Sequence, residues 1–107
     1  MPAQPKRLLR RAPVLEACRD QPRPRREIEA VTDKSRATVY RATTELEADG
    51  LLDKNGDGYR TTPRGTALSH AVETFRETVE AVDRLEPLFD AVDHPELLSN
   101  AHLLADA

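Results

Sequence analysis

Residues 33–65 constrain the fold more than any other part of this 107-residue chain. They predict a helix, then a tight β-hairpin, then the start of a further helix, and these elements follow one another directly. A helix is predicted to begin after Ser35, whose hydroxyl can cap the first backbone N–H groups. It is predicted to end at Gly50, because glycine readily adopts the left-handed conformation that follows many helices. The 3, 4, 7 spacing of an inward face is kept by Val39, Ala42, Thr43 and Leu46.

The segment after this helix predicts a tight β-hairpin. Leu51–Leu52 and Tyr59–Thr61 are two short candidate strands. Between them, Asn55-Gly-Asp-Gly58 is a strong turn signal, because these residue types tolerate positive φ angles. Thr62 can cap a further helix, and Pro63 suits its first position.

Two shorter helices are predicted upstream, over about residues 8–19 and over Pro24–Val31. Pro13 should either start or bend the first of them. In the second helix, Ile28 and Val31 are the predicted buried residues. The apolar face of the first helix is predicted to hold Leu8, Ala12, Leu15 and Cys18. The fold class that follows is mainly α with a small β-wing.

A long helix is predicted from Pro63 to Leu85, and Glu86-Pro87 should end or kink it. The apolar residues of this helix are spaced 4, 3, 4 and 3 residues apart along the chain. This spacing is typical of the narrow apolar seam along which one helix pairs with another. A second copy of the chain would bury this seam, so we predict a homodimer. Short helical segments are expected beyond, around 88–92 and from residue 93. The seam consists of Leu68, Val72, Phe75, Val79 and Val82.

Charge is distributed unevenly along the chain. Residues 1–64 hold 14 Lys and Arg against 10 Asp and Glu, a net +4, whereas residues 65–107 hold 2 against 9, a net −7. The formal charge of −3 therefore conceals a basic N-terminal part that can meet phosphate. Arginine outnumbers lysine, and the acidic surface suggests a GC-rich, salt-adapted source.

Several function classes find no support in the composition. No stretch approaches the roughly 18 apolar residues of a membrane span, and the N-terminus has no signal-like apolar region, so we expect a cytoplasmic protein. Cys18 has no partner for a disulfide and is expected to be buried. The three histidines lack ligand spacing, and no catalytic motif is present. We therefore expect no metal, no cofactor and no enzymatic activity.

Four segments carry a family resemblance that extends over about residues 10–70. Together they resemble the winged helix-turn-helix transcription regulators of bacteria and archaea, of the MarR, ArsR and IclR types. The greatest likeness is to haloarchaeal regulators that join such a domain to a C-terminal sensor domain. The segments are Arg26-Glu-Ile-Glu-Ala30, Ser35-Arg-Ala-Thr-Val-Tyr-Arg41, Leu46-Glu-Ala-Asp-Gly-Leu-Leu52 and Gly58-Tyr-Arg-Thr-Thr-Pro-Arg-Gly65.

The turn before Ser35 departs from the family pattern. Such turns commonly hold a glycine and an aliphatic residue, where this chain has Asp33 and Lys34, and Thr32 stands in place of a common leucine. The resemblance implies that the helix after Ser35 is a recognition helix for the DNA major groove. The implied DNA-binding residues are Ser35, Arg36, Thr38, Tyr40, Arg41, Thr44, Lys54, Asn55, Arg60, Arg25 and Arg26.

The chemistry of the residues on this helix agrees with that role and also leaves alternatives. Arg36 and Arg41 can each bond two acceptors of a guanine, although Arg41 could instead pair with Glu45 one turn later. Tyr40 can bond a phosphate or rest against a thymine methyl, or it can be partly buried against the second helix. The hydroxyl of Ser35 can serve phosphate binding, helix capping or both.

The remaining cations have equally ordinary alternatives. Those of the hairpin can reach a phosphate or the minor groove, or they can belong to a solvated turn. Arg25 and Arg26 open the second helix, where phosphate contact and a solvated face are both open. The basic cluster at residues 6–11 can be a flexible arm or the polar side of the first helix.

The sequence thus predicts a flexible arm at 1–7, a DNA-binding domain at 8–65 and a helical dimerisation segment at 66–107. The expected function is sequence-specific binding of double-stranded DNA at a pseudo-palindromic operator, as a homodimeric transcription regulator. A small-molecule effector would act through a C-terminal domain beyond residue 107. The alternative is a winged-helix protein–protein interaction module that reads no bases, which the net negative charge favours.

Overall fold

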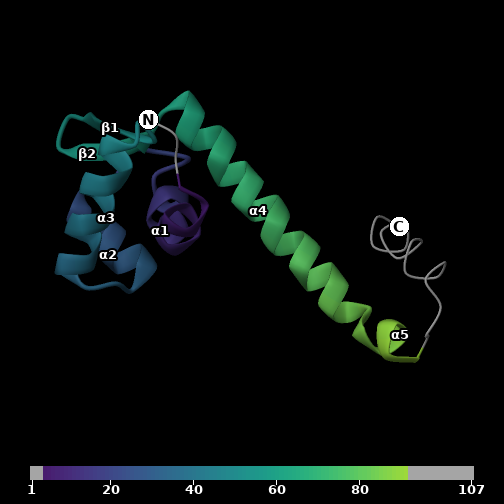
Figure 1. The fold of residues 1–107 in the computed structure, drawn as a ribbon. Coiled ribbons are helices and arrows are strands. Elements are labelled where there is room, and N and C mark those ends of the chain that lie inside the picture. The colour runs from purple at the N-terminus through teal and green to yellow at the C-terminus, as the bar shows by residue number, and fades with distance from the viewer. Residues whose placement is uncertain (1–3, 92–107) are drawn as a thin grey trace. The chain divides into compact units, whose positions relative to one another are not determined.

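A computed structural model describes residues 4–91 and has a mainly helical architecture with one small two-stranded antiparallel sheet (Figure 1). This agrees with the predicted helix-rich fold class and its hairpin. The final predicted segment, from residue 93, lies outside the described residues. The elements are α1 (Pro5–Ala17), α2 (Arg25–Thr32), α3 (Arg36–Ala48), β1 (Leu52–Asn55), β2 (Gly58–Thr61), α4 (Pro63–Arg84) and α5 (Glu86–Ala91).

Helix α1 begins at Pro5, three residues earlier than predicted, because proline has the φ angle of a first helical position and needs no N–H partner there. Pro13 lies inside the helix, which continues through it to Ala17. Cys18 follows as the C-terminal cap and is fully buried.

Helices α2 and α3 are joined by a turn in which Asp33 adopts a left-handed conformation, with φ of 55°. This is the conformation that glycine adopts most readily, and aspartate is among the residues that tolerate it. Ser35 caps α3 as predicted, since its hydroxyl oxygen accepts the Thr38 N–H at 3.1 Å. The prediction of a buried Val31 is wrong: its side chain is 56% exposed, because the short α2 buries only the stripe around Ile28.

The core lies among α1, α2, α3 and the base of the hairpin. All four residues predicted for the inward face of α3 are buried. Val14 and Tyr59 also join the core, although the apolar spacing did not single them out. Burial of these side chains is the main force that holds three short helices together. The cluster comprises Val14, Leu15, Cys18, Ile28, Val39, Ala42, Leu46, Leu51, Leu52 and Tyr59.

The hairpin is tight and its register runs from Leu52 opposite Thr61 to Asn55 opposite Gly58. Gly56 supplies the positive φ of the turn, at 65°. A third extended segment joins this sheet, because Arg23 and Tyr59 exchange backbone hydrogen bonds of 2.9 and 2.8 Å. The link between α1 and α2 is therefore attached to the hairpin.

The start of α4 is fixed against the end of α3. The Thr62 hydroxyl oxygen accepts the Gly65 N–H at 3.0 Å and its proton is donated to the Gly50 carbonyl at 2.7 Å. Gly65 approaches the chain so closely that a Cβ there would overlap the carbonyl oxygen of Leu51. Gly50 has the predicted left-handed conformation, with φ of 75°.

The compact N-terminal unit extends to Val72, so the first turns of α4 belong to it rather than to a separate segment. Val72 is 5% exposed and Leu68 packs against the core. The rest of the predicted seam belongs to the second unit, which begins at Glu73. Its members Phe75, Val79 and Val82 are 56%, 42% and 46% exposed.

Candidate functional site

The outward face of α3 opposes its buried face and is exposed. The residues on this face are exposed, whereas those on the inward face have no accessible surface. At 100° per residue, the outward face covers 140° of the helix circumference, in the order Arg36, Tyr40, Ala37, Arg41. The apolar pair in the middle therefore has an arginine on each side.

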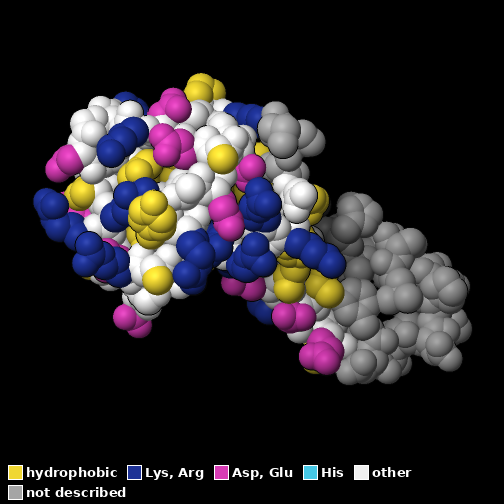
Figure 2. Space-filling model, turned by 60° about the vertical axis from the view of Figure 1, so that its left-hand side comes forward, with side chains coloured by type: hydrophobic (Ala, Val, Ile, Leu, Met, Phe, Trp, Pro, Cys, Tyr) yellow, Lys and Arg dark blue, Asp and Glu magenta, His cyan; other side chains and the backbone are white. Residues whose placement is uncertain are grey.

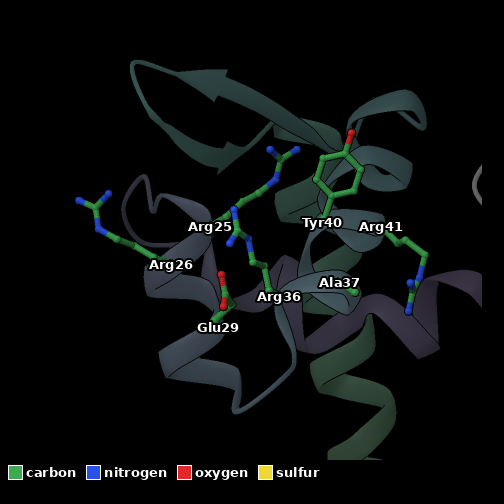
Figure 3. A pocket seen from close by; sticks show the side chains of 7 residues that line it. All are labelled: Arg25, Arg26, Glu29, Arg36, Ala37, Tyr40 and Arg41. Carbon is green, nitrogen blue, oxygen red and sulfur yellow. The ribbon is translucent and has the colours of Figure 1, made fainter.

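A hollow of about 880 Å³ lies between this face and α2 (Figure 3). Helix α2 contributes two arginines and the carboxylate of Glu29, which is the acidic residue of the lining. In Figure 3, Arg26 and Arg36 lie on the α2 side, and Arg41 extends away on the other side of Tyr40. The hollow is lined by Arg25, Arg26, Glu29, Arg36, Ala37, Tyr40 and Arg41.

Arg25 is held by three contacts within the protein. Its Nε donates to the hydroxyl oxygen of Thr43 at 2.9 Å, and its guanidinium carbon is 4.6 Å from the ring centre of Tyr40. The same carbon is 5.1 Å from the ring centre of Tyr59 in β2. One side chain of α2 thus links α3 to the hairpin. Arg25 was predicted to contact DNA, and this stays a prediction; the structure shows that its side chain is held by these three contacts within the protein.

Other arginines of the site remain available for a partner. Among residues 4–91, no hydrogen bond or ion pair involves the side chains of Arg26, Arg36, Arg41 or Arg60, all of which are exposed. The alternative pairing of Arg41 with Glu45 does not form. In Figure 2, Lys and Arg side chains surround a small apolar patch on the visible face of the N-terminal unit.

The cationic side of α1 is occupied differently. Arg11 Nε donates to Glu45 Oε2 at 2.8 Å, and Arg7 Nη1 lies 3.2 Å from Asp49 Oδ1. The hydrogen bond from Arg11 holds the pKa of the Glu45 carboxyl below its ordinary value. Two members of the basic cluster at residues 6–11 therefore join α1 to the end of α3. Of the two alternatives for this cluster, the contacts agree with the polar side of the first helix.

The hairpin presents a mixed surface. Lys54, Asn55 and Arg60 are exposed, and Lys54 Nζ is 6.0 Å from the ring centre of Tyr59. Asp57 in the turn is also exposed, and Asp53 stands opposite Arg60 in the register. The cations of the hairpin are thus near carboxylates, and the outward face of α3 is more strongly cationic.

The polar residues at the start of α3 have local partners. The Ser35 hydroxyl donates to Thr38 Oγ1 at 2.9 Å while its oxygen caps the helix. The Thr44 hydroxyl is exposed and donates to the Tyr40 carbonyl at 2.8 Å. The Ser35 hydroxyl has one proton, so it could donate to a phosphate oxygen only by giving up its bond to Thr38 Oγ1, while its oxygen continues to cap the helix.

The described part of the chain has no reactive thiol, no metal site and no membrane-spanning helix. Burial raises the pKa of the Cys18 thiol to about 11, against a smaller opposing effect of Arg23. The thiol is therefore protonated and unreactive at neutral pH. No cluster of metal-ligating side chains occurs among residues 4–91. Across the same range, no helix combines the length and apolar character needed to cross a membrane.

Sequence reasoning missed the long-range connections of the site. Thr43 was predicted to be buried, but its bond to Arg25 was not foreseen. The pairing of Arg23 with Tyr59 was also missed, although a signal existed. A residue before proline is biased to extended backbone, and Arg23 precedes Pro24.

Comparison with known proteins identifies one family for the region that contains this site. The family model described as the HVO_A0261 N-terminal domain matches residues 3–84, which include α1 to α4 and the hairpin. No curated protein matches the chain.

Proposed function

The chain belongs to the haloarchaeal HVO_A0261 N-terminal domain family, and we propose that it is a sequence-specific double-stranded DNA-binding transcription regulator that acts as a homodimer. The observation that carries the proposal is the outward face of α3. Two arginines without internal partners flank an exposed apolar pair on the side of α3 that faces away from the core. Such a face has no structural use within residues 4–91 and suits a polyanion with readable edges.

The dimensions of an α-helix support the same proposal. An α-helix with side chains is about 10–12 Å wide, and the major groove of B-DNA is about 12 Å wide. Arg36 and Arg41 would each form two hydrogen bonds with a guanine, a contact that discriminates by roughly 1–3 kcal/mol. Arg26 and the hairpin cations Lys54 and Arg60 would bind phosphates on either side of the groove.

The homodimer rests on α4. Phe75, Val79 and Val82 keep the 4, 3 spacing of a helix seam and remain about half exposed. A second copy would bury them and place two α3 helices in successive major grooves, about 34–36 Å apart on a pseudo-palindromic site. Leu68 and Val72, which were predicted for this seam, contribute to the packing of the N-terminal unit instead.

A small-molecule effector is part of the proposal. The matching family is described as an N-terminal domain, which fits a regulator with a further, ligand-binding domain. A ligand that binds such a domain would change DNA affinity only if it favoured one spacing of the two α3 helices over another.

A protein-interaction module is the second candidate, and exposed apolar residues favour it. Val31 and Tyr40 are each 56% exposed, and Leu9 is 47% exposed. Exposed apolar side chains of this size are enriched where proteins bind one another. The two functions differ in whether a DNA sequence is recognised.

Selection of bound sequences from a random duplex library tests the proposal. The parent chain is expected to enrich a two-fold symmetric motif that contains guanines. The matched variant Arg36→Lys with Arg41→Lys keeps both charges but cannot bond a guanine with two parallel donors, so it should retain binding while the motif weakens. Binding without any enriched motif, or no binding, would transfer support to the interaction module.

A further inference from the structure

The apolar pair in the middle of the α3 face has no use in a surface that binds only phosphate. Ala37 and Tyr40 are exposed, lie one turn apart and line the same hollow as the arginines (Figure 3). Phosphate binding is served by cations and hydrogen-bond donors, and exposed apolar area adds nothing to it. The exposed apolar surface of Ala37 and Tyr40, between two arginines proposed to bind guanines, therefore suits contact with an apolar group on the DNA.

The Tyr40 ring is also held in place before any partner arrives. The guanidinium of Arg25 covers the ring at 4.6 Å, and Arg25 is itself fixed by its bond to the buried hydroxyl of Thr43. The Thr43 hydroxyl donates to the Val39 carbonyl at 2.9 Å, which completes the support. A ring fixed in this way loses little rotational freedom on binding, so even a small contact contributes to affinity.

The major groove offers one apolar group on its base edges. It is the 5-methyl of a pyrimidine, present in thymine and in 5-methylcytosine, while the other groups there are hydrogen-bond donors and acceptors. Arg36 and Arg41 are five residues apart, a rise of about 7.5 Å, which is roughly two base steps. A methyl between two guanine contacts would face the Ala37 and Tyr40 side chains.

We propose that Ala37 and Tyr40 form a site that reads a pyrimidine 5-methyl group, with Arg25 as the positioning residue that holds the Tyr40 ring. This inference rests on the proposed DNA-binding function and adds the chemical class of base that the middle of α3 recognises. It gives Tyr40 a role in recognition rather than in phosphate binding.

Single replacement of thymine by deoxyuridine in the selected duplex tests the site, because it removes only the methyl and keeps the base pair. Replacement of one thymine in one half-site is expected to lower affinity about four-fold, the effect of exposing one buried methyl-sized group. Tyr40→Phe should keep this four-fold ratio whatever its effect on affinity, because the ring remains. Tyr40→Gln should abolish the ratio, with folding checked by circular dichroism.

The two sources of the methyl are distinguished by further duplexes. At the sensitive position, the thymine–adenine pair is replaced by cytosine–guanine and by 5-methylcytosine–guanine. A gain of about four-fold from cytosine to 5-methylcytosine supports methyl reading in either context. Tighter binding of the 5-methylcytosine duplex than of the thymine duplex would identify methylated DNA as the preferred source.

Other results would overturn the inference. Sequence-specific binding with no sensitivity to deoxyuridine at any position would refute methyl reading and leave the proposed function intact. A Tyr40→Phe variant that binds the thymine and deoxyuridine duplexes with the same affinity, so that the four-fold ratio is lost, would show that the ring does not read the methyl. Failure of the chain to bind any duplex would refute both the inference and the proposed function.

Discussion

Replacement of Arg25 tests whether this residue positions the site or binds DNA. In Arg25→Met the alkyl stem remains, but the bond to Thr43 and both ring contacts are lost. A hydrogen bond from a charged donor contributes about 1.5 kcal/mol, and each partly exposed cation–π contact about 0.5 kcal/mol. We therefore expect a loss of about 2–3 kcal/mol in the free energy of unfolding. Thr43 keeps its bond to the Val39 carbonyl, so no buried polar group is orphaned.

The assay combines urea unfolding with DNA affinity measured over a series of salt concentrations. Arg25→Lys should lose nearly as much stability as Arg25→Met, because an ammonium cannot lie flat between two rings. Arg26→Met is the matched control: its side chain is exposed and unpaired, so stability should change by less than about 0.5 kcal/mol.

A purely electrostatic role for Arg25 predicts a different pattern. Arg25→Lys would then keep both stability and affinity. Arg25→Met would reduce the slope of log affinity against log salt concentration by about 1, the effect of one lost phosphate contact. That combination would refute the positioning role. A stability loss shared by the lysine and methionine variants is the result that the three contacts lead us to expect.

Four further predictions concern other parts of the chain. Phe75→Glu with Val79→Glu should give a monomer by light scattering, whereas a parent chain that is already monomeric at tens of micromolar would contradict the dimer. Gly65→Ala should lower the free energy of unfolding by about 2–3 kcal/mol, because the new methyl meets backbone that cannot move aside; a loss below about 0.5 kcal/mol would contradict this close approach. Glu45→Gln should cost about 0.5 kcal/mol at pH 7 in urea unfolding. Because the folded-state pKa of this carboxyl is lowered, its contribution is present above the ordinary pKa of 4.5 and is lost as pH falls through the folded value, so the difference between parent and variant should shrink as the pH is lowered below 4.5; a constant difference would refute the linkage. The Cys18 thiol should resist a thiol reagent at pH 8 until urea unfolds the chain, and rapid reaction of the folded protein would show that it is accessible.

Local patterns predicted the elements that depend on near neighbours. The inward face of α3, the caps at Ser35 and Thr62, and the hairpin follow from spacing and from turn chemistry over a few residues. The early start of α1 at Pro5 was missed because the first residues were expected to form a flexible arm, and Pro5 was not recognised as a helix starter.

The rest of the site depends on contacts between distant residues. Arg25 is 18 positions from Thr43, and no local pattern indicates that its guanidinium contacts the rings of both Tyr40 and Tyr59. For the same reason, the split of the α4 seam at Val72 could not be read from the sequence, since a heptad pattern does not reveal which of its residues a neighbouring core already covers.

Affinity for the selected duplex most directly tests the claim that the outward face of α3 reads DNA. A labelled duplex is titrated with the parent, with Arg36→Ala combined with Arg41→Ala, and with Lys6→Ala combined with Arg10→Ala, which removes the same charge from α1. The α3 variant is expected to lose at least about 30-fold in affinity, since two contacts of roughly 1–3 kcal/mol disappear, while the α1 variant loses much less. Equal binding by the parent and the α3 variant, with both correctly folded, would contradict the assignment of this face.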